Sequence, residues 1–309
     1  MLITAERLNY TYNPSSPFST QALKDVSLTI GEGEFFGIIG HTGSGKSTFV
    51  QHLNGLIRIP SSLKKYKKRK PKKGEVPAPE PVLRVGEFDL TDKKTDFRAL
   101  RAKVGMVFQY PEYQLFAESV KEDVAFGLKN FSPRPLSAEE TEEAVRAAVE
   151  LVGLPYDEIK DMSPFELSGG QKRRVAIAGV IVTRPEVLVL DEPAAGLDPL
   201  GKQEIMDLLH KIHKTWCKTV IFVSHDMDEV AENCTRVAVF AEGQVRFVLP
   251  PAELFLHAEE LLSLGLDIPL TAKICRALSR RGIEISCDFT TEDLIRSILA
   301  CAKERGCVC

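Results

Sequence analysis

The sequence predicts an α/β fold built around a parallel β-sheet, and three observations carry this prediction. Val187–Leu190 and Val220–Val223 are apolar runs rich in β-branched residues, which is typical of parallel strands covered on both faces. Helix and strand patterns alternate along the chain as far as Val248. A glycine-rich loop, Gly40–Ser47, follows the apolar strand Phe35–Ile39 and leads directly into a helix.

The composition is that of an ordinary soluble globular protein. Of 309 residues, 44% are hydrophobic and 27% are charged, which suits one large domain or a large and a small one. The net charge of −3 creates no global field toward nucleic acid or an anionic membrane. The longest apolar run, around Val175–Val182, is too short to cross a bilayer, and we expect no secretory signal. The seven cysteines lack paired spacing, which suggests reduced cytosolic thiols.

The loop Gly40–Ser47 fits G-x-x-x-x-G-K-[S/T], the pattern of a phosphate-binding loop. Its glycines permit unusual backbone angles that turn N–H groups toward an anion, and the helix that begins at Ser44 adds partial positive charge. Lys46 supplies a full charge for the β- and γ-phosphates of a nucleotide, and Ser47 is suited to ligate Mg²⁺. A chance glycine-rich turn before Lys-Ser is the alternative, and the strand–loop–helix context argues against it.

The segments around this loop follow in order. Leu23–Ile30 alternates as a strand should, and a Gly-Glu-Gly turn leads from it into the next strand. The segment 61–81 is basic and then proline-rich, so we expect an exposed insertion, with a contact to anionic lipid headgroups as the alternative. After Phe97–Lys103, a strand runs into the aromatic-rich loop that begins at Gln109.

Two helices and a tail complete the pattern. Ser137–Leu151 is predicted to be helical because Ser137 and Glu140 form a capping box ahead of an apolar stripe. Lys172–Thr183 is the second predicted helix, and an Arg-Pro pair stops it. The tail 249–309 is expected to form a separate small α/β appendage.

Two adjacent carboxylates, Asp191 and Glu192, follow four apolar residues at the end of a predicted buried strand. Ligands collect at this edge of an open parallel sheet. One carboxylate can hold Mg²⁺ through water, and the next can polarise the water that attacks a γ-phosphate. The alternative is a plain exit from strand to turn.

Two polar residues follow other predicted strands, and one of them, His225, is expected at the same sheet edge as Glu192. His225 follows the strand Val220–Val223, which suits a contact with the γ-phosphate, although a lone histidine is more often structural. Gln109 lies just past another strand and could reach Mg²⁺ or the attacking water.

A second glycine-rich turn lies in "ELSGGQKRR", where Ser168 and the N–H groups of the two following glycines suit a phosphate. In isolation, this pattern would be only a helix start. Tyr12 is expected in a loop near the N-terminus, where its ring could stack on a purine, although an isolated tyrosine more often packs in a core.

Together, these motifs resemble the ATPase subunits of ATP-binding cassette (ABC) transporters over roughly residues 1–248. The motifs that carry the resemblance are Gly40–Thr48, Gln109, "LSGGQ" at Leu167–Gln171, "LVLDEP" at Leu188–Pro193, "AGLD" at Ala195–Asp198 and His225. Within that family the chain is most similar to the A-components of energy-coupling factor (ECF) transporters. This narrower resemblance is carried by "GHTGSGKST" with His41, "FQYPEYQLF" at Phe108–Phe116, "SPFELSGGQKRRVAIAG" at Ser163–Gly179 and "LLSLGLDIP" at Leu261–Pro269.

The resemblance implies an ABC-type P-loop NTPase fold. It would consist of a RecA-like core, an antiparallel β subdomain and a helical signature subdomain at about 110–183, all within residues 1–248. The α/β appendage at 249–309 would be a C-terminal dimerisation domain that helps to hold two ATPases together.

Carried over residue by residue, the resemblance also implies a role for each site residue. Tyr12 would stack on adenine. The phosphates of ATP would be bound by Gly40, His41, Thr42, Gly43, Ser44, Gly45, Lys46, Ser47 and Thr48. Mg²⁺ would be held by Ser47, by Gln109 and, through water, by Asp191. Glu192 would be the general base and His225 would contact the γ-phosphate, so the catalytic set is Glu192, His225, Gln109 and Lys46.

The second glycine-rich turn would act on another molecule. The ATP held by a second subunit would be bound by Ser168, Gly169, Gly170 and Gln171, and Asp198 would lie at the seam between the two subunits. One departure from the family is Ala194, which stands where members commonly have threonine.

The function implied is hydrolysis of ATP to ADP and phosphate, which would energise an ECF-type importer of vitamins or transition-metal ions. Two ATPases would lie at the cytoplasmic face of the cell membrane under a T-component, a separate S-component would bind the substrate, and no nucleic acid would be involved. The alternative hypotheses are that the chain is the ATPase of a different ABC importer, or a soluble ABC ATPase that acts on nucleic acid or ribosomes. A single cassette without sustained heptads argues against the last.

Overall fold

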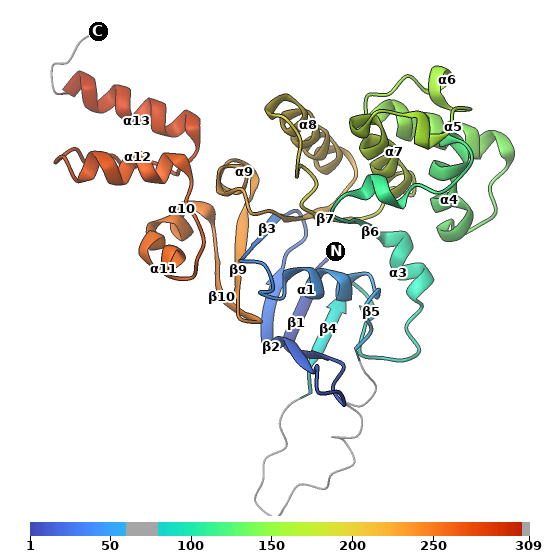
Figure 1. The fold of residues 1–309 in the computed structure, drawn as a ribbon, viewed down its shortest axis with the longest axis horizontal. Helices are drawn as coiled ribbons and strands as arrows, with labels where there is room; N and C mark the ends of the chain where they lie inside the picture. The colour runs from blue at the N-terminus through green and yellow to red at the C-terminus, as the bar shows by residue number, and fades with distance from the viewer. Residues whose placement is uncertain (60–79, 305–309) are drawn as a thin grey trace, which may run out of the picture.

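A computed structural model describes residues 1–59 and 80–304 of the chain, which form two β-sheets surrounded by helices (Figure 1). The basic segment 61–81, which was predicted to be an exposed insertion, lies almost wholly outside the described residues.

The larger sheet has six strands in the order β10-β9-β3-β8-β7-β6. Its strands are β3 (Phe35–Ile39), β6 (Val104–Val107), β7 (Val187–Asp191), β8 (Thr219–Val223), β9 (Arg236–Ala241) and β10 (Gln244–Leu249). The strands from β9 to β6 pair in parallel, and β10 pairs antiparallel to β9. The predicted parallel strands Val187–Leu190 and Val220–Val223 are confirmed as the buried neighbours β7 and β8.

The smaller sheet is antiparallel and has the order β2-β1-β4-β5. Its strands are β1 (Ile3–Tyr12), β2 (Thr20–Ile30), β4 (Val82–Val85) and β5 (Phe88–Asp89). The expectation of a loop at Tyr12 was wrong, because Tyr12 ends β1 and pairs with Thr20. Alternating threonine and tyrosine residues favour a pleated strand, and here they extend β1 to its last residue.

The apolar core lies on both faces of the six-stranded sheet because successive side chains of a strand point in opposite directions. Phe36 on β3 packs into a cluster with α1 (Lys46–Leu53) and the antiparallel sheet. Its neighbour Phe35 packs into a second cluster on the opposite face, with α8 (Pro199–Thr215) and α9 (Met227–Asn233). Both phenylalanines are almost completely buried.

A helical region gathers beyond the β6 edge of the sheet (Figure 1). Its elements are α3 (Phe97–Lys103), η1 (Pro111–Gln114), α4 (Val120–Phe131), α5 (Ala138–Leu151), α6 (Tyr156–Ile159), η2 (Pro164–Glu166) and α7 (Gly169–Ile181). The capping box predicted for Ser137 and Glu140 is present at the start of α5. The second predicted helix begins at Gly169, earlier than Lys172. Ser168 caps it, and Ser168 and Gln171 form another capping box around its first turn.

The tail lies beyond the other edge of the sheet and continues from β10 (Figure 1). Its elements are α10 (Pro251–Leu254), η3 (Phe255–His257), α11 (Ala258–Ser263), α12 (Leu270–Ser279) and α13 (Thr291–Glu304). The predicted α/β character of the appendage was wrong for its described part, since residues 250–304 contain helices and turns but no strand. Ile283–Cys287 alternates in the manner of a strand, yet it forms no ladder with another strand.

The tail is tied to the main body by packing and by backbone hydrogen bonds. Leu254 and Phe255 belong to the same buried cluster as Phe35. The backbone N–H of Leu270 donates to the Asp228 carboxylate on α9 over 2.7 Å. None of the helices in the described ranges combines the length and the apolar character that a membrane span requires.

Candidate functional site

The glycine-rich loop joins β3 to α1, and its shape requires glycine. Gly45 caps α1 with a φ of 105°, and a Cβ on it would lie 2.6 Å from the carbonyl oxygen of Ala22. A Cβ on Gly40 would lie 2.3 Å from the carbonyl oxygen of Phe240. Both distances are shorter than the contacts that real Cβ atoms make. A side chain at Gly40 or Gly45 would therefore force the loop away from β9 or β2.

Lys46 is buried inside this loop with 9% of its surface exposed. Its Nζ donates to the carbonyl oxygens of Gly40 at 2.5 Å and His41 at 3.1 Å. Burial lowers the pKa of Lys46, and the charges of Glu192 and Asp191 oppose this shift. An anion placed against the loop would stabilise the charged ammonium further.

Ser44, in the same loop, is fully buried, and its Oγ has no hydrogen-bond partner in the structure. A buried hydroxyl without a partner costs free energy.

The two adjacent carboxylates lie at the end of β7, as predicted. Asp191 is the last residue of the strand, and the backbone N–H of Glu192 donates to Val223 on β8 over 2.9 Å. Burial raises the pKa of Asp191, a hydrogen bond from Ser47 opposes that shift, and the charge of Glu192 adds to it. Glu192 itself has a φ of +51°, a left-handed conformation that is uncommon for a residue with a side chain.

Both oxygens of Glu192 are paired with residues that the sequence indicates as site candidates. Gln109 Nε2 donates to Oε2 over 2.9 Å, and His225 Nδ1 lies 3.3 Å from Oε1. Three strand ends, those of β6, β7 and β8, therefore bring these residues together. His225 is 71% exposed and Glu192 only 21%, so the carboxylate is sheltered while the imidazole stands at the open edge.

Tyr12 stands beside the glycine-rich loop and is 36% exposed. Its Oη is 3.2 Å from Thr48 Oγ1 on α1, and its ring packs edge-on against Tyr10 with a centroid distance of 4.8 Å. The structure thus places this aromatic ring next to the loop, as its predicted role requires.

The second glycine-rich turn caps α7. Ser168 Oγ accepts from the N–H of Gln171 at 3.3 Å, and the side chain of Gln171 accepts from the N–H of Ser168 at 3.0 Å. The two glycines between them face open space. In the described part of the chain, no hydrogen bond or ion pair joins this turn to the residues around Lys46 and Glu192.

Comparison with known proteins agrees with this arrangement. A family model described as "ABC transporter" matches residues 23–195. The chain belongs to the ABC transporter family.

Similar relatives are named for one transporter type. The chain is 45% identical to the energy-coupling factor transporter ATP-binding protein EcfA2 of Caldanaerobacter subterraneus subsp. tengcongensis over 94% of both chains. It is 48% identical to the EcfA2 of Symbiobacterium thermophilum over 98% of both chains.

Solved cassettes share the fold. CbiO1 of Clostridium perfringens, described as part of the ABC transporter complex cbiONQ, has a TM-score of 0.67 and 37% identity, with 88% of this chain and 97% of that chain covered. The dimeric cassette MJ0796 in a post-hydrolysis state with ADP and Pi also has a TM-score of 0.67, with 27% identity over 80% of this chain and 98% of the other.

The sequence did not single out one residue that the structure places in the centre of this cassette. Arg173 on α7 is 4% exposed and forms an ion pair with Glu112 on η1. It also donates to the carbonyl oxygen of Ala195 over 2.7 Å. In the sequence it stands in the basic run "KRR", which reads as a solvated surface, so no local signal marks it as buried.

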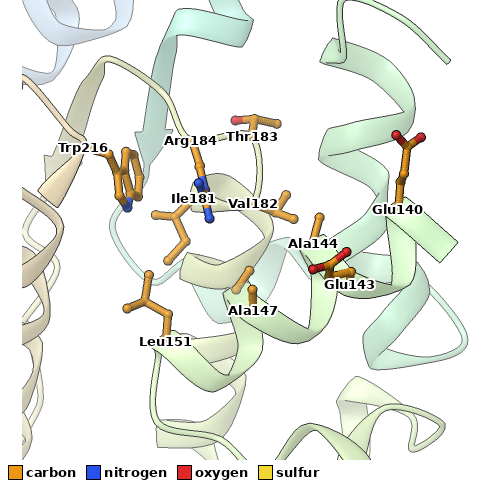
Figure 2. Close-up of a pocket in the computed structure, with 11 residues that line it drawn as sticks. Glu140, Glu143, Ala144, Ala147, Leu151, Ile181, Val182, Thr183, Arg184 and Trp216 are labelled. Atoms are coloured by element: carbon orange, nitrogen blue, oxygen red, sulfur yellow. The ribbon is translucent and has the colours of Figure 1, made fainter. Parts of the chain in front are cut away.

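One hollow of the cassette is separate from the candidate site. The pocket in Figure 2 is lined by α5, the end of α7 and Trp216, and none of its lining residues belongs to the candidate site. Within the described ranges, no three His, Cys, Asp or Glu side chains form a metal cluster, and the five described cysteines are free thiols.

Proposed function

We propose that this chain is the ATP-binding and ATP-hydrolysing subunit of an ECF-type importer. The observation that carries the proposal is the Glu192 carboxylate, held between Gln109 and His225 at the sheet edge where the Lys46 loop ends. The relatives named EcfA2, which match over nearly their whole length, support the transporter type.

The loop residues fit the phosphates of ATP. The backbone leaves no room for a Cβ at Gly40 or Gly45, Lys46 is buried with carbonyl partners, and the buried hydroxyl of Ser44 has no partner within the chain. These are the features of a backbone cradle for phosphates at a helix N-terminus. Tyr12 supplies a ring beside that cradle on which adenine would stack.

The residues also fit Mg²⁺, which prefers oxygen ligands. Ser47 Oγ and the Asp191 carboxylate are in hydrogen-bonding contact, so two such oxygens lie together. Gln109 donates through Nε2 to Glu192, which leaves its side-chain oxygen as an acceptor for a cation. When bound, Mg²⁺ would neutralise charge on the phosphates.

Glu192 is the residue that this arrangement assigns to the attacking water. Its carboxylate would orient the water and accept its proton, while Gln109 and His225 hold the two carboxylate oxygens in place. Lys46 and the loop N–H groups would stabilise the charge that develops on the phosphate.

The second glycine-rich turn supports a dimer. Ser168 and the glycines after it are exposed, capped and unconnected to the chain's own Lys46, so they would bind the ATP of a second ATPase subunit. The dimeric form of the similar cassette MJ0796 supports this arrangement. The tail 249–309 would act as the dimerisation domain of the chain, and 1–248 as its ATPase domain.

Membrane partners complete the proposal. The ATPase pair would sit peripherally at the cytoplasmic face of the cell membrane under a T-component, with an S-component that binds a vitamin or a transition-metal ion. No nucleic acid takes part.

The test combines an assay and a purification. The wild-type chain, produced together with a second ATPase and a T-component, should co-purify with both and hydrolyse ATP in a Mg²⁺-dependent manner. The same complex with Lys46→Ala should assemble without turnover. A wild-type complex that assembles and shows no more ATP turnover than Lys46→Ala would overturn the proposal.

A further inference from the structure

A buried guanidinium links three segments of the ABC fold. Arg173 lies on α7, five residues after Ser168, and it has 4% of its surface exposed. Taking an arginine out of water is costly unless its donors are paired, so each of its contacts has to be accounted for.

The first contact is with the loop that carries Gln109. Arg173 Nε and Nη2 donate to the two carboxylate oxygens of Glu112 at 3.3 and 3.2 Å. This two-pronged geometry fixes direction as well as distance. Glu112 lies on η1, three residues after Gln109, and its side chain is 19% exposed.

The second contact is with the turn that follows Glu192. Arg173 Nη1 donates to the carbonyl oxygen of Ala195 at 2.7 Å and to that of Pro193 at 3.4 Å. The same turn is closed by a hydrogen bond from the N–H of Ala195 to the carbonyl of Glu192 at 3.1 Å. The backbone of Glu192 is in the left-handed region, so outside contacts are needed to hold it there.

These contacts close a ring. Gln109 donates to the Glu192 carboxylate, and the turn after Glu192 accepts from Arg173. Arg173 also donates to Glu112, which lies on the same loop as Gln109. A shift of α7 would therefore act on the Gln109 loop and on the turn after Glu192 at the same time.

We propose that Arg173 and Glu112 are positioning residues for ATP hydrolysis, which set the geometry of Gln109 and Glu192 according to the position of α7. The inference rests on the proposed ATPase function. Since α7 begins at the turn assigned to the second subunit's ATP, docking of that ATP would be relayed through Arg173 to the chain's own carboxylate. Neither residue belongs to the proposed nucleotide site, so the pair would act on turnover rather than on binding.

The test is a double-mutant cycle in the complete transporter complex. Glu112→Gln removes the charge of the carboxylate that pairs with Arg173 and keeps the shape of the side chain. We expect kcat to fall roughly 10- to 100-fold, because a small misplacement of a reacting group has that cost, while KM for ATP changes less than about threefold. Gln109→Ala should lower kcat as well. In the Gln109→Ala background, Glu112→Gln should cause little further loss, because both changes break one ring.

Three further variants separate positioning from general stability. Arg146 and Asp157 form a similar two-pronged ion pair at 2.6 and 2.9 Å on the surface of the helical region, so Asp157→Asn should leave kcat unchanged. Glu112→Asp keeps the charge and should recover part of the loss. Arg173→Lys keeps the positive charge but loses the two-pronged hydrogen bonding to Glu112. If this variant folds, its kcat should fall as much as that of Glu112→Gln.

Three results would overturn the inference. The first is a Glu112→Gln complex with wild-type kcat. The second is a double variant whose fold-loss of kcat equals the product of the losses in Glu112→Gln and Gln109→Ala, which would mean that the two residues act independently. The third is a fall in ATP affinity and melting temperature that parallels the loss of kcat. Failure of the wild-type complex itself to hydrolyse ATP is a different result, which removes the proposed function and this inference together.

Discussion

Gln109 Nε2 lies 2.9 Å from Glu192 Oε2, although the two residues are 83 positions apart in the chain. His225 Nδ1 lies 3.3 Å from the other oxygen of the same carboxylate. Parallel strands β6, β7 and β8 end at one edge of the sheet, and this edge gathers the three side chains. The carboxylate is thereby fixed in orientation before any water reaches it.

Replacing Glu192 by glutamine should separate binding from hydrolysis. Glu192→Gln keeps the shape of the side chain and an acceptor for Gln109 but removes the base. We expect ATP affinity to be retained and turnover to fall by roughly 10²–10⁴. The ATP-bound dimer should then accumulate, which size-exclusion chromatography with ATP would detect. Wild-type turnover in Glu192→Gln would show that another group is the base.

Lys46→Ala should differ from Glu192→Gln by weakening the binding of ATP itself. Lys46 Nζ is buried and already directed into the loop by two carbonyl oxygens, so its loss removes a charged donor from the phosphate site. Charged hydrogen bonds are worth about 1.5–3 kcal/mol, which corresponds to a loss of affinity of roughly 10- to 150-fold. Equilibrium binding of a fluorescent ATP analogue would measure it. If both variants showed the same defect, the separate roles of Lys46 and Glu192 would be wrong.

Asp191→Asn should stabilise the nucleotide-free protein near neutral pH. Burial raises the pKa of Asp191 above its ordinary value of 3.8, so the folded state holds this proton at pH values where the unfolded chain has released it. Its contribution to stability is therefore present below the ordinary value and is lost as pH rises through the raised pKa. The neutral amide avoids that loss, so the melting temperature should rise at pH 7.

The gain in melting temperature from Asp191→Asn should shrink as the pH falls toward the ordinary carboxyl range, and Mg²⁺-dependent hydrolysis should be abolished at every pH. Asp207→Asn, at an exposed position on α8, is the matched control and should show no such pH dependence. A gain that stays constant with pH would mean that ionisation of Asp191 is not its cause.

Local patterns were sufficient to predict most of the fold. The strands β3, β7 and β8, the helix after Ser137 and the glycine-rich loop each have a signal within a few residues, in hydrophobic period, cap or motif. The α/β character expected of the tail was wrong for residues 250–304. Ile283–Cys287 alternates like a strand, but a strand also needs a neighbour to pair with, which a local pattern does not supply.

The candidate site was likewise predictable only as far as local sequence patterns reach. His225 was predicted at the sheet edge of Glu192, and Gln109 just past another strand; the structure brings the three side chains together in contacts that the sequence did not predict. Arg173 was missed because its burial depends on three segments that meet only in the folded chain. Tyr12 was placed in a loop because the pairing of the end of β1 with β2 is a tertiary fact rather than a local one.

The ring of Tyr12, rather than its hydroxyl, should carry adenine binding. Tyr12→Phe removes the contact with Thr48 Oγ1 and keeps the ring, so ATP affinity should change little. Tyr12→Ala should weaken binding by about 1–3 kcal/mol, the usual worth of stacking a base on an aromatic ring. Titration with ATP and with inorganic triphosphate would check this, since the triphosphate should not distinguish the variants. An equal loss in Tyr12→Phe would instead assign the effect to the hydroxyl.

The surface after Gln109 should be the contact with the membrane component. Tyr113 is 85% exposed and Phe116 is 60% exposed, and Phe116 packs edge-on against Phe126 with a centroid distance of 4.9 Å. Exposed aromatic side chains gathered at one loop are typical of an interaction surface. Because this loop starts at the residue that contacts Glu192, a partner bound here would be linked to the hydrolysis site.

Tyr113→Ala and Phe116→Ala should therefore weaken assembly with the T-component while leaving ATP hydrolysis by the isolated subunit nearly intact. The ring of Tyr113 makes little contact within the chain, so its removal should cost the fold almost nothing, and the free energy lost should be that of the interface. Phe18→Ala is the matched control, since Phe18 is 83% exposed on the loop between β1 and β2. Co-purification with the T-component should fall for the first two variants and not for the control. Unchanged co-purification in all three would exclude this surface, and an equal loss in all three would show that exposed aromatic area alone drives the association.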